Sequence, residues 1–431
     1  MAAIAFFPEG AYGPTNNCAG IGAVLRERGH RVVFIVEESF AGTLEARGFE
    51  ERLVRLGPPP AVPEAPGQFW KDFIRDTAPV FRRPTIEQLE QFIAPTFKAL
   101  IDGARYVDER LREIIDELQP DVVVEDNVVG FPALAAGGRP WVRIVSCNPA
   151  ELKDELVPPV FSGYPAGERA GWEEYWQEYR RAIGPLHDEH DELHRDRGAP
   201  GLPELELIGS SPWLNLYLYP RELDYRRTAP PSGRWVALES CVRAPDGPWS
   251  PPGGDERPLV YLSLGSLGSA DVGLMQRLID TLAECDVSAI VSLGPQHELL
   301  RLPAHMHGAE YLPQTAILPH ADAVITHGGN NTVTECMHFG CPMVVLPLFW
   351  DQHDNAQRVR ELGYGVRLDP YGHEPAELVA ALRGLLADRG LRERLGKASA
   401  RLQREPGTVR AADAIELVAT GALSPAQLDV A

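Results

Sequence analysis

The segment from residue 311 to residue 355 carries the densest set of side chains that could bind a phosphate-bearing ligand. Its centre is a short apolar run at 323–326, followed by His-Gly-Gly-Asn-Asn and by helical spacing from about Thr332. Two glycines let the backbone turn sharply and approach a ligand closely. The start of a helix offers unpaired N–H groups and a partial positive charge. This pattern predicts an anion site at the end of a buried strand, suited to a diphosphate.

Other polar side chains are expected around the same site. Glu335, one turn into the helix, could accept hydrogen bonds from two ribose hydroxyls, as an acidic residue does in other nucleotide folds. Asp351 and Gln352 follow the next apolar run, and a carboxylate beside an amide is well suited to sugar hydroxyls. Ser266 follows the run at 259–264 and is placed to touch phosphate. A single glycine-rich turn often serves packing alone, but several polar strand exits in one half of the chain favour a binding site.

The first 35 residues predict a βαβ unit. The apolar run at 2–7 is typical of a buried strand, and a loop rich in Gly, Pro and Asn is expected at 8–17. Helical spacing follows at 18–28, and a second strand is expected at 31–36. Such units, repeated along the chain, build parallel sheets covered by helices.

Two domains account for the whole chain of 431 residues. The stretch 242–258 is rich in Pro and Gly without an apolar period, so it predicts a linker. We therefore expect an α/β protein with two facing Rossmann-like domains, residues 1–241 and 259–431. Whether the last helix packs back on the N-terminal domain stays open.

Composition limits the partners and the location. With 41 Lys and Arg against 61 Asp and Glu, the formal charge is −20, which argues against nucleic acid or an anionic membrane as partner. The first residues lack the basic region of a signal peptide, and no apolar stretch reaches 18 residues. The six scattered cysteines suit a reducing compartment. We expect a cytoplasmic protein, monomeric or homodimeric.

The segment at 311–355 resembles the nucleotide-sugar signature of family-1 glycosyltransferases, which include plant secondary-metabolite enzymes and bacterial antibiotic and macrolide glycosyltransferases. The order and spacing match over about 45 residues, with weaker likeness at 261–266 and in the first βαβ unit. The matching residues are Pro313, Gln314, His327, Gly329, Asn331, Thr332, Glu335, Asp351, Gln352 and Asn355. The resemblance implies the GT-B fold, with the nucleotide-sugar donor held by the C-terminal domain.

The resemblance also implies a role for each donor-binding residue. Tyr311 and Gln314 would contact the nucleobase, and His327, Asn331 and Thr332, beside Gly329, would contact the phosphates. Glu335 would contact the ribose, and Asp351 and Gln352 the transferred sugar. Tyr311 stands where the family usually has Trp, and Thr332 where it has Ser. Both substitutions keep the chemistry, a stacking ring and a hydroxyl.

The general base of the family is missing. There, a His in a Gly-His-x-x-Pro turn after the first strand removes the acceptor proton, and an Asp after a later strand orients it. The matching turn here is 13–17, in which Pro14 replaces the His, whereas the Asp is kept as Asp126. Asp126, Glu9 or Tyr12 could act as base. A carboxylate with its usual pKa of about 4 would need burial to raise that pKa, or an acidic acceptor.

Two further explanations of the missing His stay open. The acceptor could be a nitrogen or carbon nucleophile, or the protein could have lost turnover and serve as a donor-binding auxiliary subunit. A GT-B sugar-nucleotide epimerase is an alternative from another enzyme class.

Aromatic side chains in two segments without strand character are candidates for the acceptor site: Phe69, Trp70, Trp172 and Trp176. Trp172 and Trp176 lie at helical spacing and could equally be core residues. On the same predicted helix, His187, His190 and His194 share a face, but their strongly charged surroundings favour a solvated face over a metal site.

The sequence thus predicts an inverting glycosyltransferase that moves a hexose from a UDP- or dTDP-sugar to a hydroxyl, or another nucleophile, of a bulky natural product such as a macrolide. Inversion comes from the resemblance alone. No metal or other cofactor is expected, because no Asp-x-Asp-like pair lies by the phosphate loop and a helix start can carry the leaving-group charge.

Overall fold

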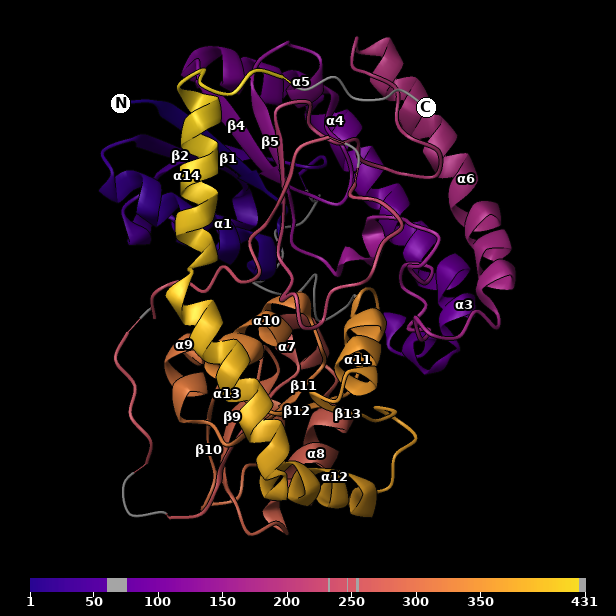
Figure 1. Ribbon diagram of the computed structural model, residues 1–431, viewed down its shortest axis with the longest axis vertical. Coiled ribbons are helices and arrows are strands. Elements are labelled where there is room, and N and C mark those ends of the chain that lie inside the picture. The colour runs from indigo at the N-terminus through magenta and orange to yellow at the C-terminus, as the bar shows by residue number, and fades with distance from the viewer. Residues whose placement is uncertain (60–75, 232, 246, 253–255, 426–431) are drawn as a thin grey trace.

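The computed structural model describes residues 1–59, 76–231, 233–245, 247–252 and 256–425. Two α/β domains lie one above the other, each built on a parallel sheet (Figure 1). The N-terminal sheet has the order β3-β2-β1-β4-β5-β6-β7. Its strands are β1 (Ala3–Pro8), β2 (Arg31–Glu37), β3 (Glu50–Val54), β4 (Val122–Asp126), β5 (Trp141–Val145), β6 (Leu214–Tyr217) and β7 (Trp235–Ala237).

The C-terminal sheet has the order β10-β9-β8-β11-β12-β13 and is also parallel throughout. Its strands are β8 (Leu259–Ser263), β9 (Ser288–Ser292), β10 (His307–Ala309), β11 (Ala323–Thr326), β12 (Met343–Val345) and β13 (Gly365–Arg367). The linker predicted at 242–258 therefore lies between the last strand of one sheet and the first strand of the other. The expected α/β class with two Rossmann-like domains is confirmed.

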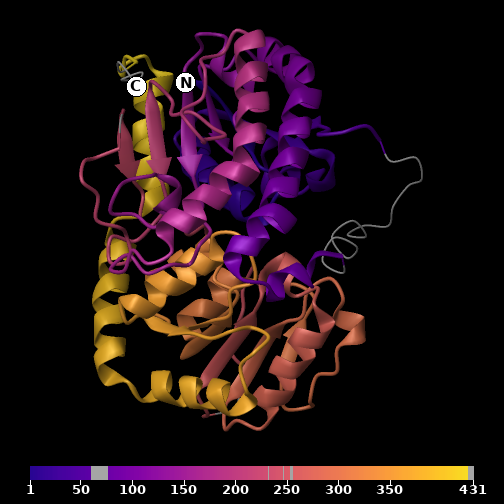
Figure 2. The same cartoon turned by 90° about the vertical axis from the view of Figure 1, so that its right-hand side faces the viewer.

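Helices cover both sheets (Figures 1 and 2). In the N-terminal domain they are α1 (Tyr12–Glu27), α3 (Thr85–Gln88), α4 (Ala94–Leu118), α5 (Pro132–Ala135) and α6 (Trp172–Asp196). After the linker follow α7 (Gly265–Gly268), α8 (Val272–Ala283), α9 (Gln314–Ile317), α10 (Asn330–Phe339), α11 (Gln352–Glu361), α12 (Pro375–Ala387), α13 (Arg389–Arg404) and α14 (Gly407–Ala419).

Strand register brings the predicted site residues to common sheet edges. In the N-terminal sheet, Pro8 of β1 is paired with Asp126 of β4, so both strands end at the same level. In the C-terminal sheet, Thr326 of β11 is paired with Ser263 of β8 and with Val345 of β12. Because the carboxyl ends of parallel strands meet at one edge, the loops that follow them lie together. Both site-bearing edges face the other domain.

The last helix packs on the N-terminal domain. Helix α14 lies beside α1, as Figures 1 and 2 show, whereas α13 lies along the C-terminal domain. His30 Nε2 is 2.7 Å from Glu416 Oε1 of α14, and the Arg28 guanidinium donates to Glu416 Oε2. Helix α14 thereby joins the C-terminal half of the chain to the N-terminal domain.

Helix α1 begins earlier than the sequence suggests. The expected loop at 8–17 is wrong in its second half, because helix starts at Tyr12. Ala11 is extended and its carbonyl accepts from the Thr15 N–H at 3.2 Å, which closes the first turn. Pro14 lies within that turn, where a missing N–H costs nothing because it would have no partner in the helix. The segment matched to the family's His turn is thus helical.

Within the part of the chain that the structure describes, no helix is both long enough and apolar enough to cross a bilayer.

Candidate donor and acceptor site between the domains

The predicted phosphate loop has a geometry that requires glycine. Gly328 has φ +88°, and a Cβ at this position would come within 2.5 Å of Val345 Cγ1. Gly329 is the N-cap of α10, which begins at Asn330, two residues before the expected start. The first bond of the helix is from the Val333 N–H to the Gly329 carbonyl, so the earlier N–H groups have no partner within the helix. The loop therefore presents a helix start at the carboxyl end of β11, as the sequence predicts.

His327 lies between two glycine backbones. A Cβ on Gly265 would come within 2.7 Å of His327 Cε1, and one on Gly329 within 2.6 Å of Nε2. Gly265 also has φ +70° and begins α7, so the loop that carries Ser266 lies next to His327. Burial lowers the pKa of His327 to about 4. The imidazole is therefore neutral at pH 7 and has a single N–H, for which an anion would compete with the Ser263 backbone.

Glu335, the predicted ribose contact, is engaged on both carboxylate oxygens. Gln314 Nε2 donates to Oε2 at 2.5 Å and lies 3.3 Å from Thr332 Oγ1. Arg243 of the linker places Nη1 3.5 Å from Oε1. Three predicted donor residues, Gln314, Thr332 and Glu335, therefore lie together, and Arg243 joins them from outside the C-terminal sheet.

Tyr311, the predicted contact of the nucleobase, is largely exposed, and its ring centroid lies 6.2 Å from that of Tyr12. Tyr12 also packs against Phe40, with ring centroids 5.4 Å apart. The two tyrosines come from different domains. Tyr12 was a candidate base, but its place beside Tyr311 suits contact with a nucleobase better than with a reacting proton.

Of the two predicted sugar-binding residues, Asp351 contacts the other domain. Asp351 Oδ2 accepts from the Asn148 N–H at 2.8 Å, and Asn148 Nδ2 donates to Asn355 Oδ1 at 2.8 Å. Burial raises the pKa of Asp351 to about 7, which the Asn148 hydrogen bond opposes. Gln352 Oε1 instead accepts from the Leu348 and Phe349 N–H groups and so shapes its own turn. Asp351 faces the N-terminal domain, whereas Gln352, with its Oε1 held in the turn, offers a sugar hydroxyl the donors of its Nε2.

Asp126 is buried and only one of its carboxylate oxygens is engaged by a described residue. Its Oδ1 accepts from Ser146 Oγ at 2.7 Å, while Oδ2 has no hydrogen-bond partner among the residues that the structure describes. Burial raises the pKa of Asp126 to about 8; the Ser146 hydrogen bond opposes this rise, and the charge of Glu9 adds to it. Glu9 follows β1, and burial raises its pKa to about 7. Both carboxyls titrate near neutral pH, where a general base works best.

One residue links this carboxyl to the phosphate loop. The backbone carbonyl of Ser146 accepts from Asn330 Nδ2 at 2.8 Å, and Asn330 is the first residue of α10. Nearby, Asn331 Nδ2 donates to the Gly13 carbonyl at 2.9 Å, and Asn17 Nδ2 donates to Asn331 Oδ1 at 2.8 Å. The first turns of α1 and α10 thus meet at the boundary between the domains, where Pro14 stands in place of the family's His.

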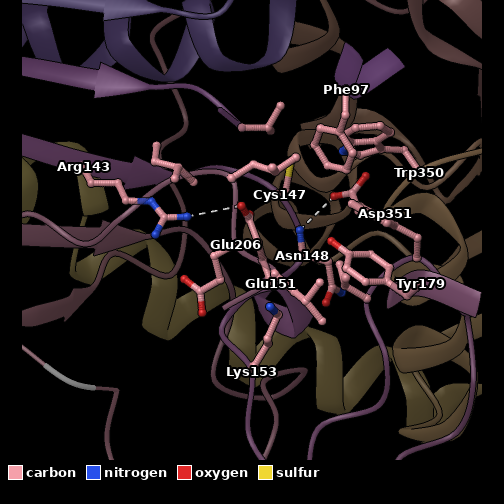
Figure 3. A pocket seen from close by; sticks show the side chains of 16 residues that line it. Phe97, Arg143, Cys147, Asn148, Glu151, Lys153, Tyr179, Glu206, Trp350 and Asp351 are labelled. Atoms are coloured by element: carbon pink, nitrogen blue, oxygen red, sulfur yellow. Dashed lines mark hydrogen bonds and ion pairs between the residues drawn. The ribbon is translucent and has the colours of Figure 1, made fainter. Parts of the chain in front are cut away.

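A narrow cavity opens beside these contacts (Figure 3). Asp351 and Trp350 line it from the C-terminal domain, and Figure 3 shows Arg143 and Glu151 paired on the opposite side. The other lining residues labelled in Figure 3 are Phe97, Cys147, Asn148, Lys153, Tyr179 and Glu206. The space within it is about 30 Å³, enough for one water molecule. Pockets for drug-sized ligands measure about 300–1,000 Å³, so a bulky acceptor needs this cavity to widen.

Neither of the two predicted acceptor aromatics that the structure describes, Trp172 and Trp176, lines this cavity. Phe69 and Trp70 lie outside the described residues. Trp172 is buried, and Trp176 packs against Tyr179 with ring centroids 5.3 Å apart. Tyr179, from the same helical face, does line the cavity. The stripe of aromatics on α6 is thus mainly core, with one member at the cavity.

The expected solvated face of α6 is wrong for two of its histidines. His190 and His194 are 0% and 3% exposed, with ring centroids 4.7 Å apart. His187 is partly exposed and lies 2.9 Å from the Pro203 carbonyl oxygen. Helix α6 packs against α4, so one face of a highly charged helix is buried. Among the described residues, no group of three or more His, Cys, Asp or Glu could hold a metal ion.

Sequence reasoning did not single out Ser146, Asn148, Asn330 or Arg243. The first two follow β5 directly, so the rule that polar residues after buried strands gather at one edge could have found them. Asn330 stands inside the recognised loop. Arg243 lies in the linker, and its contact with Glu335 joins residues 92 positions apart, which no local pattern shows.

Comparison with known proteins finds similarity along nearly the whole chain. Residues 276–417 match the family described as "Erythromycin biosynthesis protein CIII-like, C-terminal domain". The demethyllactenocin mycarosyltransferase of Streptomyces fradiae is 26% identical over 434 residues, covering 99% of this chain and 87% of that protein. The oleandomycin glycosyltransferase of Streptomyces antibioticus is 27% identical over 423 residues, covering 96% and 90%.

Solved structures resemble the chain over nearly its full length. The glycotransferase of kitacinnamycin has a TM-score of 0.65 at 25% identity, covering 97% of this chain and all of that one. The calicheamicin glycosyltransferase CalG4 has a TM-score of 0.65 at 22% identity, covering 97% and 98%. The family match, the relatives and these structures confirm the resemblance: the chain has the GT-B fold and is similar to bacterial antibiotic glycosyltransferases over nearly its full length.

Proposed function

We propose that this protein transfers a sugar from a nucleotide diphosphate donor to a nucleophile of a bulky natural product, with inversion at the anomeric carbon. The printed names of the relatives, a mycarosyltransferase and an oleandomycin glycosyltransferase, support sugar transfer to such acceptors. The observation that carries the proposal is the chain of contacts Asp126–Ser146–Asn330, because it joins a buried proton acceptor to the phosphate loop.

The C-terminal half of the site serves the leaving group. In the proposed complex, the diphosphate lies at the start of α10, where the unpaired N–H groups and the helix dipole stabilise negative charge. Neutral His327 donates a further hydrogen bond, and Thr332 offers its hydroxyl. These groups act on the charge that develops as the diphosphate departs, so we propose that the reaction needs no metal ion.

Asp126 is our preferred general base. Its Oδ2 has no partner among the described residues, while Ser146 fixes the other oxygen. The acceptor oxygen forms a bond to the anomeric carbon, the bond from that carbon to the diphosphate oxygen breaks with its electron pair, and the acceptor proton passes to Oδ2. Glu9 raises the pKa of Asp126 through its charge and is the second candidate for the proton.

The raised pKa of Asp126 addresses the missing histidine. An ordinary carboxylate is a weak base at pH 7, but one with a pKa of about 8 is at least as basic as the imidazole it would replace, whose usual pKa is about 6.5. The raised pKa also means that, in much of the free enzyme, Asp126 is protonated at pH 7. We therefore expect the ionised, active fraction to grow as the pH rises toward 8.

A transfer assay tests the proposal. UDP- and dTDP-sugars are incubated with a panel of macrolide and polyketide aglycones, and products are identified by mass spectrometry and by the configuration of the new bond. Release of a glycosylated acceptor supports the proposal. Epimerised nucleotide-sugar without acceptor would indicate an epimerase, and tight binding without turnover an auxiliary protein; either result would overturn it.

Asp126→Asn tests the base. It keeps the shape of the side chain but removes the proton acceptor, so turnover should fall at least about tenfold while donor affinity stays nearly constant. Glu9→Gln is the matched comparison. An unaffected Asp126→Asn rate, with a large loss in Glu9→Gln, would move the base to Glu9.

A further inference from the structure

Unfavourable backbone conformations gather around the cavity of Figure 3. Among the described residues, five that are not glycine have a left-handed backbone, and three of these line the cavity: Phe161 (φ +67°), Leu205 (φ +57°) and Trp350 (φ +57°). Bulky side chains disfavour this conformation, so it persists only where the surrounding structure imposes it, most often at functional sites. The three residues belong to separate loops, so what they share is the cavity.

The indole of Trp350 lies on the apolar side of the cavity. Its ring centroid is 5.0 Å from that of Phe97 on α4 and 4.7 Å from that of Phe161, and these two rings are 6.1 Å apart. Figure 3 shows Trp350 and Phe97 on the side away from Arg143. Both phenylalanines belong to the N-terminal domain, whereas Trp350 directly precedes Asp351 in the C-terminal domain. The indole thus fills an aromatic corner across the domain boundary.

Phe97 and Phe161 are held more firmly than Trp350. Their side chains are 4% and 6% exposed, and the Phe161 N–H donates to Asp354 Oδ2 of α11 at 2.6 Å. Trp350 has the largest of the three rings, yet it is only partly buried. A turn of Trp350 away from the cavity would release its unfavourable backbone conformation. It would leave the two phenylalanine rings in place, facing the space that the indole had filled.

This cavity lies where the acceptor is expected. Cys147, in its wall, follows Ser146, which holds the proposed base Asp126, and Asp351, the proposed sugar contact, lines the same space. The free space of about 30 Å³ admits one water molecule. An acceptor must therefore displace part of the wall, and the least firmly held part among the three aromatic rings is Trp350.

We propose that the indole of Trp350 occupies, in the free protein, the subsite for a flat aromatic ring of the acceptor. The inference rests on the proposed function and narrows its acceptors to natural products that carry such a ring. On binding, the acceptor ring takes the place of the indole against Phe97 and Phe161, and Trp350 turns away. Aromatic pairs are favourable at centroid distances of about 4.5–7 Å, so a flat ring can repeat the contacts that the indole makes.

Calorimetric titration of the free protein with 2-naphthol tests the proposal. Trp350→Gly removes the indole and suits the left-handed backbone, so 2-naphthol should bind at least about tenfold more tightly than to the wild type, because no ring has to be displaced. Free indole should compete with 2-naphthol in this variant, since it refills the space that the side chain left. Trp249→Gly removes an indole that packs on His320 instead, and this matched control should keep the wild-type affinity.

Two further measurements make the test independent of one variant and one ligand. Trp350→Phe keeps a smaller ring and should bind 2-naphthol about threefold more tightly than the wild type, which carries the test if Trp350→Gly does not fold. A melting curve for each variant establishes folding. Decahydro-2-naphthol is similar in size but not flat, so its gain in Trp350→Gly should stay within about twofold. An equal gain for both compounds would overturn the assignment to an aromatic ring.

The transfer assay separates this inference from the proposed function. Absence of transfer by the wild-type protein would contradict the proposed function, and the acceptor subsite falls with it. Transfer by the wild type, combined with a folded Trp350→Gly that binds 2-naphthol no more tightly, would contradict the role of Trp350 alone. Transfer together with the expected gain and with competition by indole supports both.

Discussion

Asn330 Nδ2 donates a hydrogen bond to the backbone carbonyl of Ser146 at 2.8 Å, across the boundary between the two domains. The hydroxyl of the same Ser146 holds Asp126 Oδ1 at 2.7 Å. The first residue of the phosphate-loop helix and the proposed base are thus fixed to one residue. This arrangement couples the position of the donor to that of the proton acceptor, which an in-line displacement requires.

The pH dependence of kcat/KM should identify the base. A base must be ionised, so activity rises with pH through the pKa of the group responsible, at about 8 for Asp126 and about 7 for Glu9. Ser146→Ala removes a hydrogen bond that lowers the pKa of Asp126, so the rise should move to higher pH by about one unit. Ser39→Ala, at an exposed position just after β2, should leave the profile in place. A profile that Ser146→Ala does not move would contradict Asp126 as base.

Gly265→Ala should disturb His327 and thereby weaken nucleotide binding. The added methyl would meet the imidazole at 2.7 Å, and the backbone there has φ +70°, so the ring must shift. We expect roughly tenfold weaker binding of a nucleoside diphosphate, about the loss of one good hydrogen bond to a charged group. His327→Ala should give a similar loss.

Gly396→Ala is the matched control for that experiment. Nothing lies within 4 Å of the methyl that it adds in the middle of α13, so the substitution should leave nucleotide affinity unchanged and raise helix stability by up to about 1 kcal/mol. Titration calorimetry and urea denaturation measure the two effects. Equal affinities for Gly265→Ala and Gly396→Ala would mean that His327 has no part in binding.

The buried histidines of α6 should make the fold sensitive to acid. Burial, followed by the neighbouring His194, lowers the pKa of His190 to about 3, so the folded protein keeps this ring neutral. An unfolded chain takes up the proton below about pH 6.5. The unfolded state then binds more protons, so this contribution to stability is complete above about pH 6.5 and is lost as the pH falls toward 3.

The comparison of His190→Leu with wild type isolates this contribution. Urea unfolding at pH 7.5 and at pH 5 should show a smaller loss of stability on acidification in the variant, because one buried titrating ring is gone. Carboxyls with raised pKa values, such as Glu125, change stability in the opposite direction with pH, but they are common to both proteins and cancel in the difference. An identical pH response of the two proteins would contradict this account.

Local patterns predicted the parts of the site that lie within one strand and its following loop. The turn at His327 was recognisable because an apolar strand, two glycines and a helix start adjoin in sequence. The same reasoning failed for His190 and His194, since charged neighbours on the outer face of α6 mask the face that packs on α4. It also missed that Gly13 and Pro14 lie inside the first turn of α1.

Contacts between distant segments could not be predicted in this way. Ser146 and Asn330 lie 184 positions apart, and their hydrogen bond depends on how the two domains face each other. The burial that raises the pKa of Asp126 has the same origin, because a strand-end carboxylate is exposed or buried according to what packs over it.

Hydrogen exchange with and without a nucleoside diphosphate tests the central claim most directly. We predict that UDP or dUDP slows exchange of the amides at 327–335, the turn and first helical turns after β11, and that His327→Ala weakens this protection. Protection confined to another part of the chain, or none at millimolar nucleotide, would contradict a donor site at the start of α10.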